Sequence, residues 1–149
     1  MALGATALAT AAGTTSPAPS TTPPPAVEDF SYPGAGRVLK DKGLKLISGD
    51  GHIMLAECSS QWSIKVQASK NNSFTEYCFN VSGGTGYLAL EVPGTFGLWN
   101  DDHNLRATLT SDGKTKTIDV AKDDVTTVGE ADIPSGGKKA TLVELRVTG

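Results

Sequence analysis

The stretch that decides the fold runs Trp62-Ser-Ile-Lys-Val-Gln-Ala-Ser69, where apolar and polar residues alternate at every position. Its even-numbered residues, from Trp62 to Ala68, are expected to face the core, because successive side chains of a strand point to opposite sides. The same alternation recurs in 86–92, 105–110 and 143–147. Strands with one apolar and one polar face are typical of antiparallel sheets.

Turn-forming residues separate these strands. Gly-rich or Pro-rich turns occupy 48–51, 82–86 and 134–137, and Ser111-Asp-Gly-Lys114 is typical of a tight hairpin. We count about nine strands and no convincing helix, since the one weak candidate, 121–125, is too short. A single sheet of that size would leave an apolar face in water. The sequence therefore predicts an all-β fold, an antiparallel β-sandwich of about nine strands, with a closed β-barrel as the alternative.

The N-terminal residues differ in composition from the rest of the chain. Residues 1–12 are small, apolar and uncharged, which favours a truncated signal peptide whose true start lies upstream of Met1; an ordinary Ala-rich tail is the alternative. They are too short for a membrane span, which needs about 20 apolar residues. Residues 13–29 are rich in Pro, Thr and Ser and are expected to form a disordered spacer. This leaves 30–149 as a single β-domain.

Length and charge exclude several classes of protein. A chain of 149 residues is too short for a TIM barrel or for a dinucleotide-binding domain with a substrate domain. The 13 basic and 16 acidic residues give a net charge of −3, with no basic stripe. Nucleic acid is not expected as a ligand, because phosphate binding needs clustered positive charge. We expect a monomer without a cofactor.

Cys58 and Cys78 are the two cysteines of the chain. They form no C-x-x-C motif, and no matched pair of histidines lies nearby, which disfavours a redox or metal site. We expect a structural disulfide between neighbouring or facing strands, which indicates an oxidising compartment outside the cell. Its closed loop is expected to stabilise the fold by about 3 kcal/mol.

Two turns hold the polar groups that could form a metal site. Asp50 and His52 lie in one turn, and Asp101 and His103 lie in the other. If the turns met in space, these side chains could ligate zinc or calcium. Asp and Asn are also the ordinary residues of turns, where they accept local backbone hydrogen bonds. Turn formation is the favoured interpretation, and these four residues are weak metal candidates.

Trp99 is the main candidate for ligand binding. It stands beside a polar turn, and an exposed indole near amide and carboxylate groups can stack on a sugar ring and bind its hydroxyls. The favoured interpretation of Trp99 is nonetheless that it closes one end of the core, and we expect Trp62 to lie in the core. The candidate ligand-binding residues are Trp99, Asn100, Asp101, Asp102, His103 and Tyr87.

Several stretches of the domain resemble a group of small secreted proteins of actinobacteria that has no established activity. The resemblance covers most of 33–149 and includes both cysteines. It implies export and a compact β-domain, and it assigns no catalytic or binding residue. The stretches that carry it are Gly86–Pro93, Thr110–Lys114, Thr117–Lys122, Val128–Glu130 and Leu142–Gly149.

The sequence contains no recognisable catalytic set. We therefore expect a secreted, non-catalytic bacterial domain that binds extracellular or cell-wall polysaccharide, or a protein partner. The alternative is an enzyme inhibitor, with the 70–73 turn as its contact, or a small hydrolase-associated domain.

Overall fold

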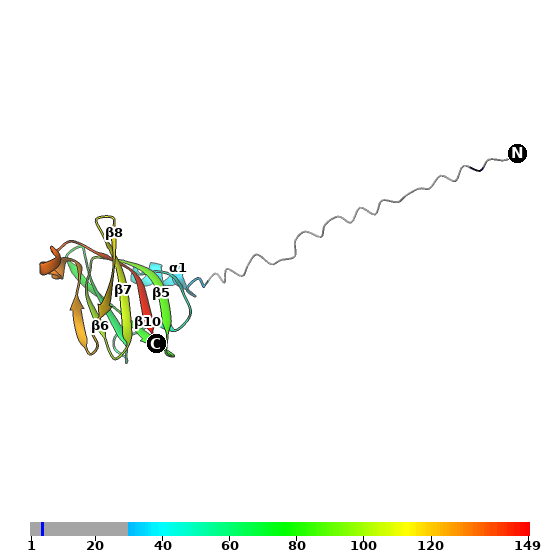
Figure 1. Ribbon diagram of the computed structural model, residues 1–149, viewed down its shortest axis with the longest axis horizontal. Helices are drawn as coiled ribbons and strands as arrows, with labels where there is room; N and C mark the ends of the chain where they lie inside the picture. Colours follow the sequence, from blue (N-terminus) through cyan, green and yellow to red (C-terminus); the bar gives the residue numbers. More distant parts are fainter. Residues whose placement is uncertain (1–3, 5–29) are drawn as a thin grey trace.

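A computed structural model describes Gly4 and residues 30–149 of the chain. The expected signal peptide (1–12) and spacer (13–29) lie outside the described residues, apart from Gly4. Ten strands form two antiparallel sheets of five strands each, which we call sheet A and sheet B. The sheets pack face to face (Figure 1).

Sheet A has the strand order β1-β5-β10-β7-β8, and Figure 1 shows β5, β10 and β7 side by side. Its strands in that order are β1 (Lys45–Gly49), β5 (Gly86–Pro93), β10 (Thr141–Thr148), β7 (Asn104–Ser111) and β8 (Lys114–Val120). Every neighbouring pair is antiparallel.

Sheet B has the order β2-β4-β3-β6-β9, again fully antiparallel. Its strands in that order are β2 (Ile53–Ala56), β4 (Ser73–Val81), β3 (Ile64–Lys70), β6 (Thr95–Asn100) and β9 (Asp124–Thr127). The β-sandwich prediction is confirmed, and the sheets do not close into a barrel. The structure has ten strands where about nine were expected, and β9 begins within 121–125, the segment considered only as a weak helix candidate.

The core lies between the sheets, and period-two alternation places its side chains there. Ile64, Val66 and Ala68 of β3 are buried, as the sequence predicts, and Phe79 is among the largest fully buried side chains. Burial of Ile64, Val66 and Phe79 stabilises the fold by about 1.5–3 kcal/mol per side chain. Trp62 breaks the expectation: it is half-buried and lies outside the core, because β3 begins only at Ile64.

The alternation expected in the last strand is shifted by a β-bulge. Val143 was expected to face inward with Leu145 and Val147, but Leu142 is the buried residue at that end of β10. The pairing of β10 with both neighbours shifts between Leu142 and Glu144. The extra residue at the bulge changes which side chains face the core.

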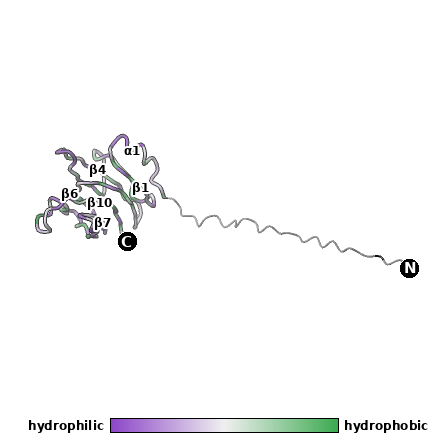
Figure 2. The backbone as a smooth tube through the Cα atoms, turned by 90° about the horizontal axis from the view of Figure 1, so that it is seen from above, coloured by the Kyte–Doolittle hydropathy of each residue, from purple (hydrophilic) through white to green (hydrophobic). Residues whose placement is uncertain are grey.

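One short α-helix, which the sequence analysis did not predict, precedes the first strand. It is α1 (Ala35–Lys42), and it lies against β1 on the outside of the sandwich (Figure 2). Gly34 and Gly43 flank it in the left-handed conformation, and Lys40 and Lys42 lie in its last turn, where cations favour the helix dipole. No residue of α1 is fully buried, and its 8 residues are fewer than hydrophobic periodicity needs to identify a helix.

Two 3₁₀ turns, η1 (Gly129–Ala131) and η2 (Ile133–Ser135), connect β9 to β10. Within the described residues, no helix has the length and apolar character needed to cross a membrane.

The predicted disulfide is confirmed. Cys58 lies two residues after β2 and is bonded to the fully buried Cys78 of β4, with 5.2 Å between their Cα atoms. Strands β2 and β4 are neighbours in sheet B, so the bond anchors the segment 57–63 to the sheet. That segment leads to Trp62 and then into β3.

Candidate functional site

The two polar turns from the sequence analysis lie at the same end of the sandwich but do not meet. Residues 50–52 connect β1 to β2 at one side, whereas 101–103 connect β6 to β7. Strands β1 and β7 are three positions apart in sheet A, which corresponds to roughly 14 Å. Within the part of the chain that the structure describes, no three His, Cys, Asp or Glu side chains group into a possible metal site.

Asp50 and His52 make hydrogen bonds that hold their own turn. Asp50 Oδ1 accepts the backbone N–H groups of His52 (3.0 Å) and Tyr87 (3.2 Å). His52 Nδ1 lies 2.6 Å from the carbonyl oxygen of Thr85. These contacts fasten the β1–β2 turn to the β4–β5 connection.

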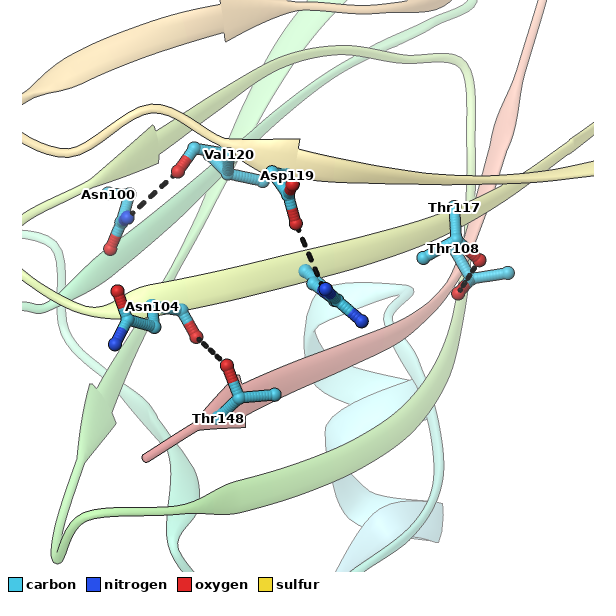
Figure 3. Close-up of polar contacts among 8 residues, drawn as sticks. Asn100, Asn104, Thr108, Thr117, Asp119, Val120 and Thr148 are labelled. Carbon is cyan, nitrogen blue, oxygen red and sulfur yellow. Dashed lines mark hydrogen bonds and ion pairs between the residues drawn. The ribbon is translucent and has the colours of Figure 1, made fainter.

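Asn100 is also committed to the fold, which corrects its assignment as a ligand-binding residue. It is only 2% exposed, and its Nδ2 donates to the carbonyl oxygens of His103 (2.7 Å) and Val120 (3.2 Å), the latter drawn in Figure 3. Its Oδ1 accepts the N–H of His103 at 3.3 Å. Nδ1 of His103 is buried and has no hydrogen-bond partner among the described residues, so this atom is not exposed to a ligand either. Asp101 and Asp102 are exposed.

Trp99 lies on the outer face of sheet B, so the favoured interpretation, which places it at the end of the core, is wrong. Leu98 and Asn100 on either side of it point inward, and Trp99 is 37% exposed. Its indole Nε1 donates to Gln67 Oε1 at 3.1 Å, and Gln67 Nε2 donates to Glu76 Oε1 at 3.1 Å. The ring is therefore held on the sheet surface by a chain of hydrogen bonds across β6, β3 and β4.

Gly97 gives the Gln67 side chain room to reach Trp99. The two residues pair across β3 and β6. A Cβ atom at position 97 would lie 2.5 Å from Gln67 Oε1, closer than two such atoms can approach. The absence of a side chain at Gly97 thus lets Gln67 lie across β6.

Both tryptophans of the chain line one groove of about 600 Å³, which we call the tryptophan groove. Lys65 lies beside both rings: it pairs with Trp99 in the sheet register, and its Nζ lies 4.5 Å from the centroid of the Trp62 ring. The main side chains of the groove are Gln61, Trp62, Asn80, Trp99, Asp101 and Asp123. Its volume is in the range of small-ligand sites.

Backbone hydrogen bonds join the loops that form the tryptophan groove. The N–H of Asp101 donates to the carbonyl of Ser63 at 2.8 Å, and the N–H of Asp123 donates to the carbonyl of Asp101 at 2.6 Å. The N–H of Ser63 in turn donates to the carbonyl of Phe79 in β4 at 2.8 Å. Together with the disulfide, these bonds fix the groove before any ligand arrives.

Tyr87, the remaining candidate, lies on the other sheet. It belongs to β5 in sheet A, where the guanidinium of Arg146 lies 4.8 Å from the centroid of its ring. The same face carries paired polar side chains such as Thr108 and Thr117, whose hydroxyls lie 3.0 Å apart (Figure 3). Tyr87 is therefore not part of the site that contains Trp99.

A second cavity, of about 560 Å³, lies at the opposite end of the sandwich and is lined by opposite charges. Lys45 pairs with Glu91 at 3.0 Å, and Lys139 lies 3.9 Å from Glu130. Burial raises the pKa of the Tyr77 hydroxyl beside it. Lys70 also lines the cavity, whose charged lining therefore consists of three lysines and two glutamates.

A third cavity, of about 440 Å³, lies between the edge strands β8 and β9. Leu109 and Ile118 form part of its apolar wall, and Lys116 and Lys138 also line the cavity. Lys138 binds Asp112 at 2.8 Å, and this hydrogen bond and charge raise the pKa of the lysine. Lysines along an edge strand discourage pairing with another chain.

Comparison with models of protein families finds no match, and a search of curated proteins finds no match either.

The sequence analysis identified Trp99 and Asp101 but missed Trp62, Gln61, Asn80 and Asp123. The six residues come from three separate loops and two strands, which only the folded chain brings together. The arrangement offers two indole rings with carboxylate and amide groups at their edges, and no nucleophile paired with a base.

Proposed function

We propose that this protein is a non-catalytic module that binds polysaccharide outside the cell through the tryptophan groove. The observation that carries the proposal is the presence of Trp62 and Trp99 in one groove with exposed amide and carboxylate groups. A sugar ring has an apolar face that stacks on an indole and a rim of hydroxyls that hydrogen-bond to carboxylates and amides.

The rigidity of the groove supports this function. Binding costs less free energy when the contacting groups are already ordered. Trp99 is held by Gln67 at 3.1 Å, and the loops of Ser63 and Asp101 are joined through their backbones. A ligand would meet a surface that needs little rearrangement.

The extracellular location is supported by the disulfide and by the composition of the N-terminal residues. The Cys58–Cys78 bond is of the kind that persists in oxidising compartments. Small, apolar residues 1–12 followed by a Pro-rich segment are typical of exported bacterial proteins.

A role as an enzyme inhibitor receives less support. It depends on the 70–73 turn, in which Asn71 (φ 51°) and Asn72 (φ 61°) form a tight two-residue hairpin between β3 and β4. Such a turn is too short to present the extended loop that enters an enzyme cleft. We therefore assign a polysaccharide ligand.

The test is capture of the purified protein on insoluble cellulose, chitin and bacterial cell walls. We expect at least one of these polymers to retain it, and Trp99→Ala to weaken binding about tenfold or more, because one stacked ring is lost. Phe30→Ala is the matched control, since Phe30 is 51% exposed and lies outside the groove. Failure of all three polymers to retain the wild-type protein, or equal retention of Trp99→Ala, would contradict the proposal.

A further inference from the structure

A second group of aromatic side chains lies on the outer face of sheet B. Phe74 of β4 is 80% exposed, the highest value among the large apolar side chains of the described residues. Its ring meets that of Phe96 edge to face, with the centroids 5.5 Å apart. Folding alone gives no reason for such exposure, because this ring buries little area.

The strand register explains why both phenylalanines reach this face. Phe74 pairs with Ser69, on the side of the sheet opposite to the buried Ala68. The pairing of β3 with β6 shifts between Gln67 and Ala68, which leaves Phe96 as an extra residue on β6. A bulge of this kind redirects a side chain, and here it brings Phe96 to Phe74.

The Phe74–Phe96 pair and the tryptophan groove lie at the two ends of one face. Trp99 pairs with Lys65, and Phe74 pairs with Ser69, so the two sites are four residues apart along β3. This corresponds to roughly 13 Å, which is longer than two linked pyranose rings. Gln67 lies between them, and its amide, which bonds Trp99 and Glu76, keeps one N–H for a ligand that spans the distance.

The charges along this path favour a neutral ligand. Lys65 Nζ lies 3.6 Å from Glu76 Oε2, so these two charges compensate each other. Asp101 and Asp123 add negative charge at the groove. These carboxylates would repel a polyanionic chain, whereas a neutral chain can donate hydrogen bonds to them from its hydroxyl groups.

We propose that the ligand is an internal segment of a linear, neutral polysaccharide that lies along the strands of sheet B. The chain stacks on Trp99 and Trp62 at one end and on Phe74 at the other, with Gln67 and Glu76 beneath its middle. This inference rests on the proposed function, and it adds that affinity depends on chain length and not on a chain end.

The experiment is calorimetric titration with cello-oligosaccharides and N-acetylchito-oligosaccharides, from disaccharide to hexasaccharide. We expect the hexasaccharide of one series to bind at least about tenfold more tightly than its disaccharide. Phe74→Ala is expected to remove most of that gain and to leave disaccharide binding unchanged, whereas Trp99→Ala weakens both. Phe30→Ala, another exposed phenylalanine, is expected to change neither.

The outcomes separate this inference from the proposed function. Equal affinity of the wild-type protein for disaccharide and hexasaccharide would overturn the inference but leave the groove as a binding site. Wild-type affinity of Phe74→Ala for the hexasaccharide would have the same consequence. No binding of either series by the wild-type protein would overturn the inference. If that protein is also not retained by the insoluble polymers, the proposed function falls with it. Since Phe74 is largely exposed, the variant is expected to melt close to the wild-type temperature.

Discussion

Removing the disulfide is expected to lower both stability and ligand binding. The bond joins residues that are 20 positions apart in the chain, and its Cys78 end is fully buried. On the chain-entropy model, a closed loop of this length stabilises the folded state by about 3 kcal/mol. Residues 30–149 have an unfolding entropy of roughly 0.25 kcal/mol/K, so the melting temperature should fall by about 12 °C.

The assay compares thermal unfolding of the wild-type protein, with and without a reducing agent, with unfolding of a Cys58→Ser, Cys78→Ser double variant. The reduced protein and the variant are expected to melt at the same lowered temperature. Binding should weaken as well, because the bond anchors the segment that carries Trp62.

Two results would contradict a stabilising disulfide between Cys58 and Cys78. Thiol labelling of the native protein should find neither Cys58 nor Cys78 free. Two reactive thiols would remove the basis for the stability estimate and for the extracellular location. A melting temperature that changes by less than about 2 °C on reduction would show that the bond does not constrain the unfolded chain.

Two further substitutions test the sheet surface and the partly buried side chain of Tyr77. Gly97→Ala should displace Gln67 and weaken ligand binding by several-fold at little cost in melting temperature, because the obstructing atom is the end of a flexible side chain; unchanged binding would show that Gln67 does not position Trp99. Burial raises the pKa of Tyr77 above its ordinary value of 10.0, so its contribution to stability should be complete below pH 10.0 and lost as the pH rises through the raised pKa. Unfolding titrations across that range should show a smaller loss for Tyr77→Phe, and identical curves would contradict the assignment.

The fold could be predicted from the sequence because its main signal is local. Alternation in 62–69, 86–92 and 105–110 identifies strands with one buried face, and the buried residues of β3, β5 and β7 agree with it from Ile64 onward. The errors lie where geometry between strands changes that pattern. Val143 is displaced by a bulge that depends on the neighbours of β10, which no local pattern reveals.

The candidate site could be predicted only in part, because it depends on which loops become neighbours. The position of Trp99 next to Leu98 was a usable signal for an exposed indole. If the leucine faces the core, its neighbour in the strand must face outward, and the structure shows this arrangement. Nothing in the sequence shows that Trp62 shares a groove with Trp99. That proximity follows from the pairing of β3 with β6, which are 25 or more residues apart in the chain.

The polar residues of the turns and the aromatic residues of the strands have opposite roles. Asp50 and Asn100 direct their side-chain oxygens to backbone N–H groups, and Asn100 is buried in doing so, which means that folding itself accounts for them. Phe74 gains little from folding, and exposed apolar area on a strand face invites aggregation. We propose that a ligand accounts for this large exposed ring, which neither the core nor a turn requires, and that the binding surface extends from the loops of the tryptophan groove onto the outer face of sheet B.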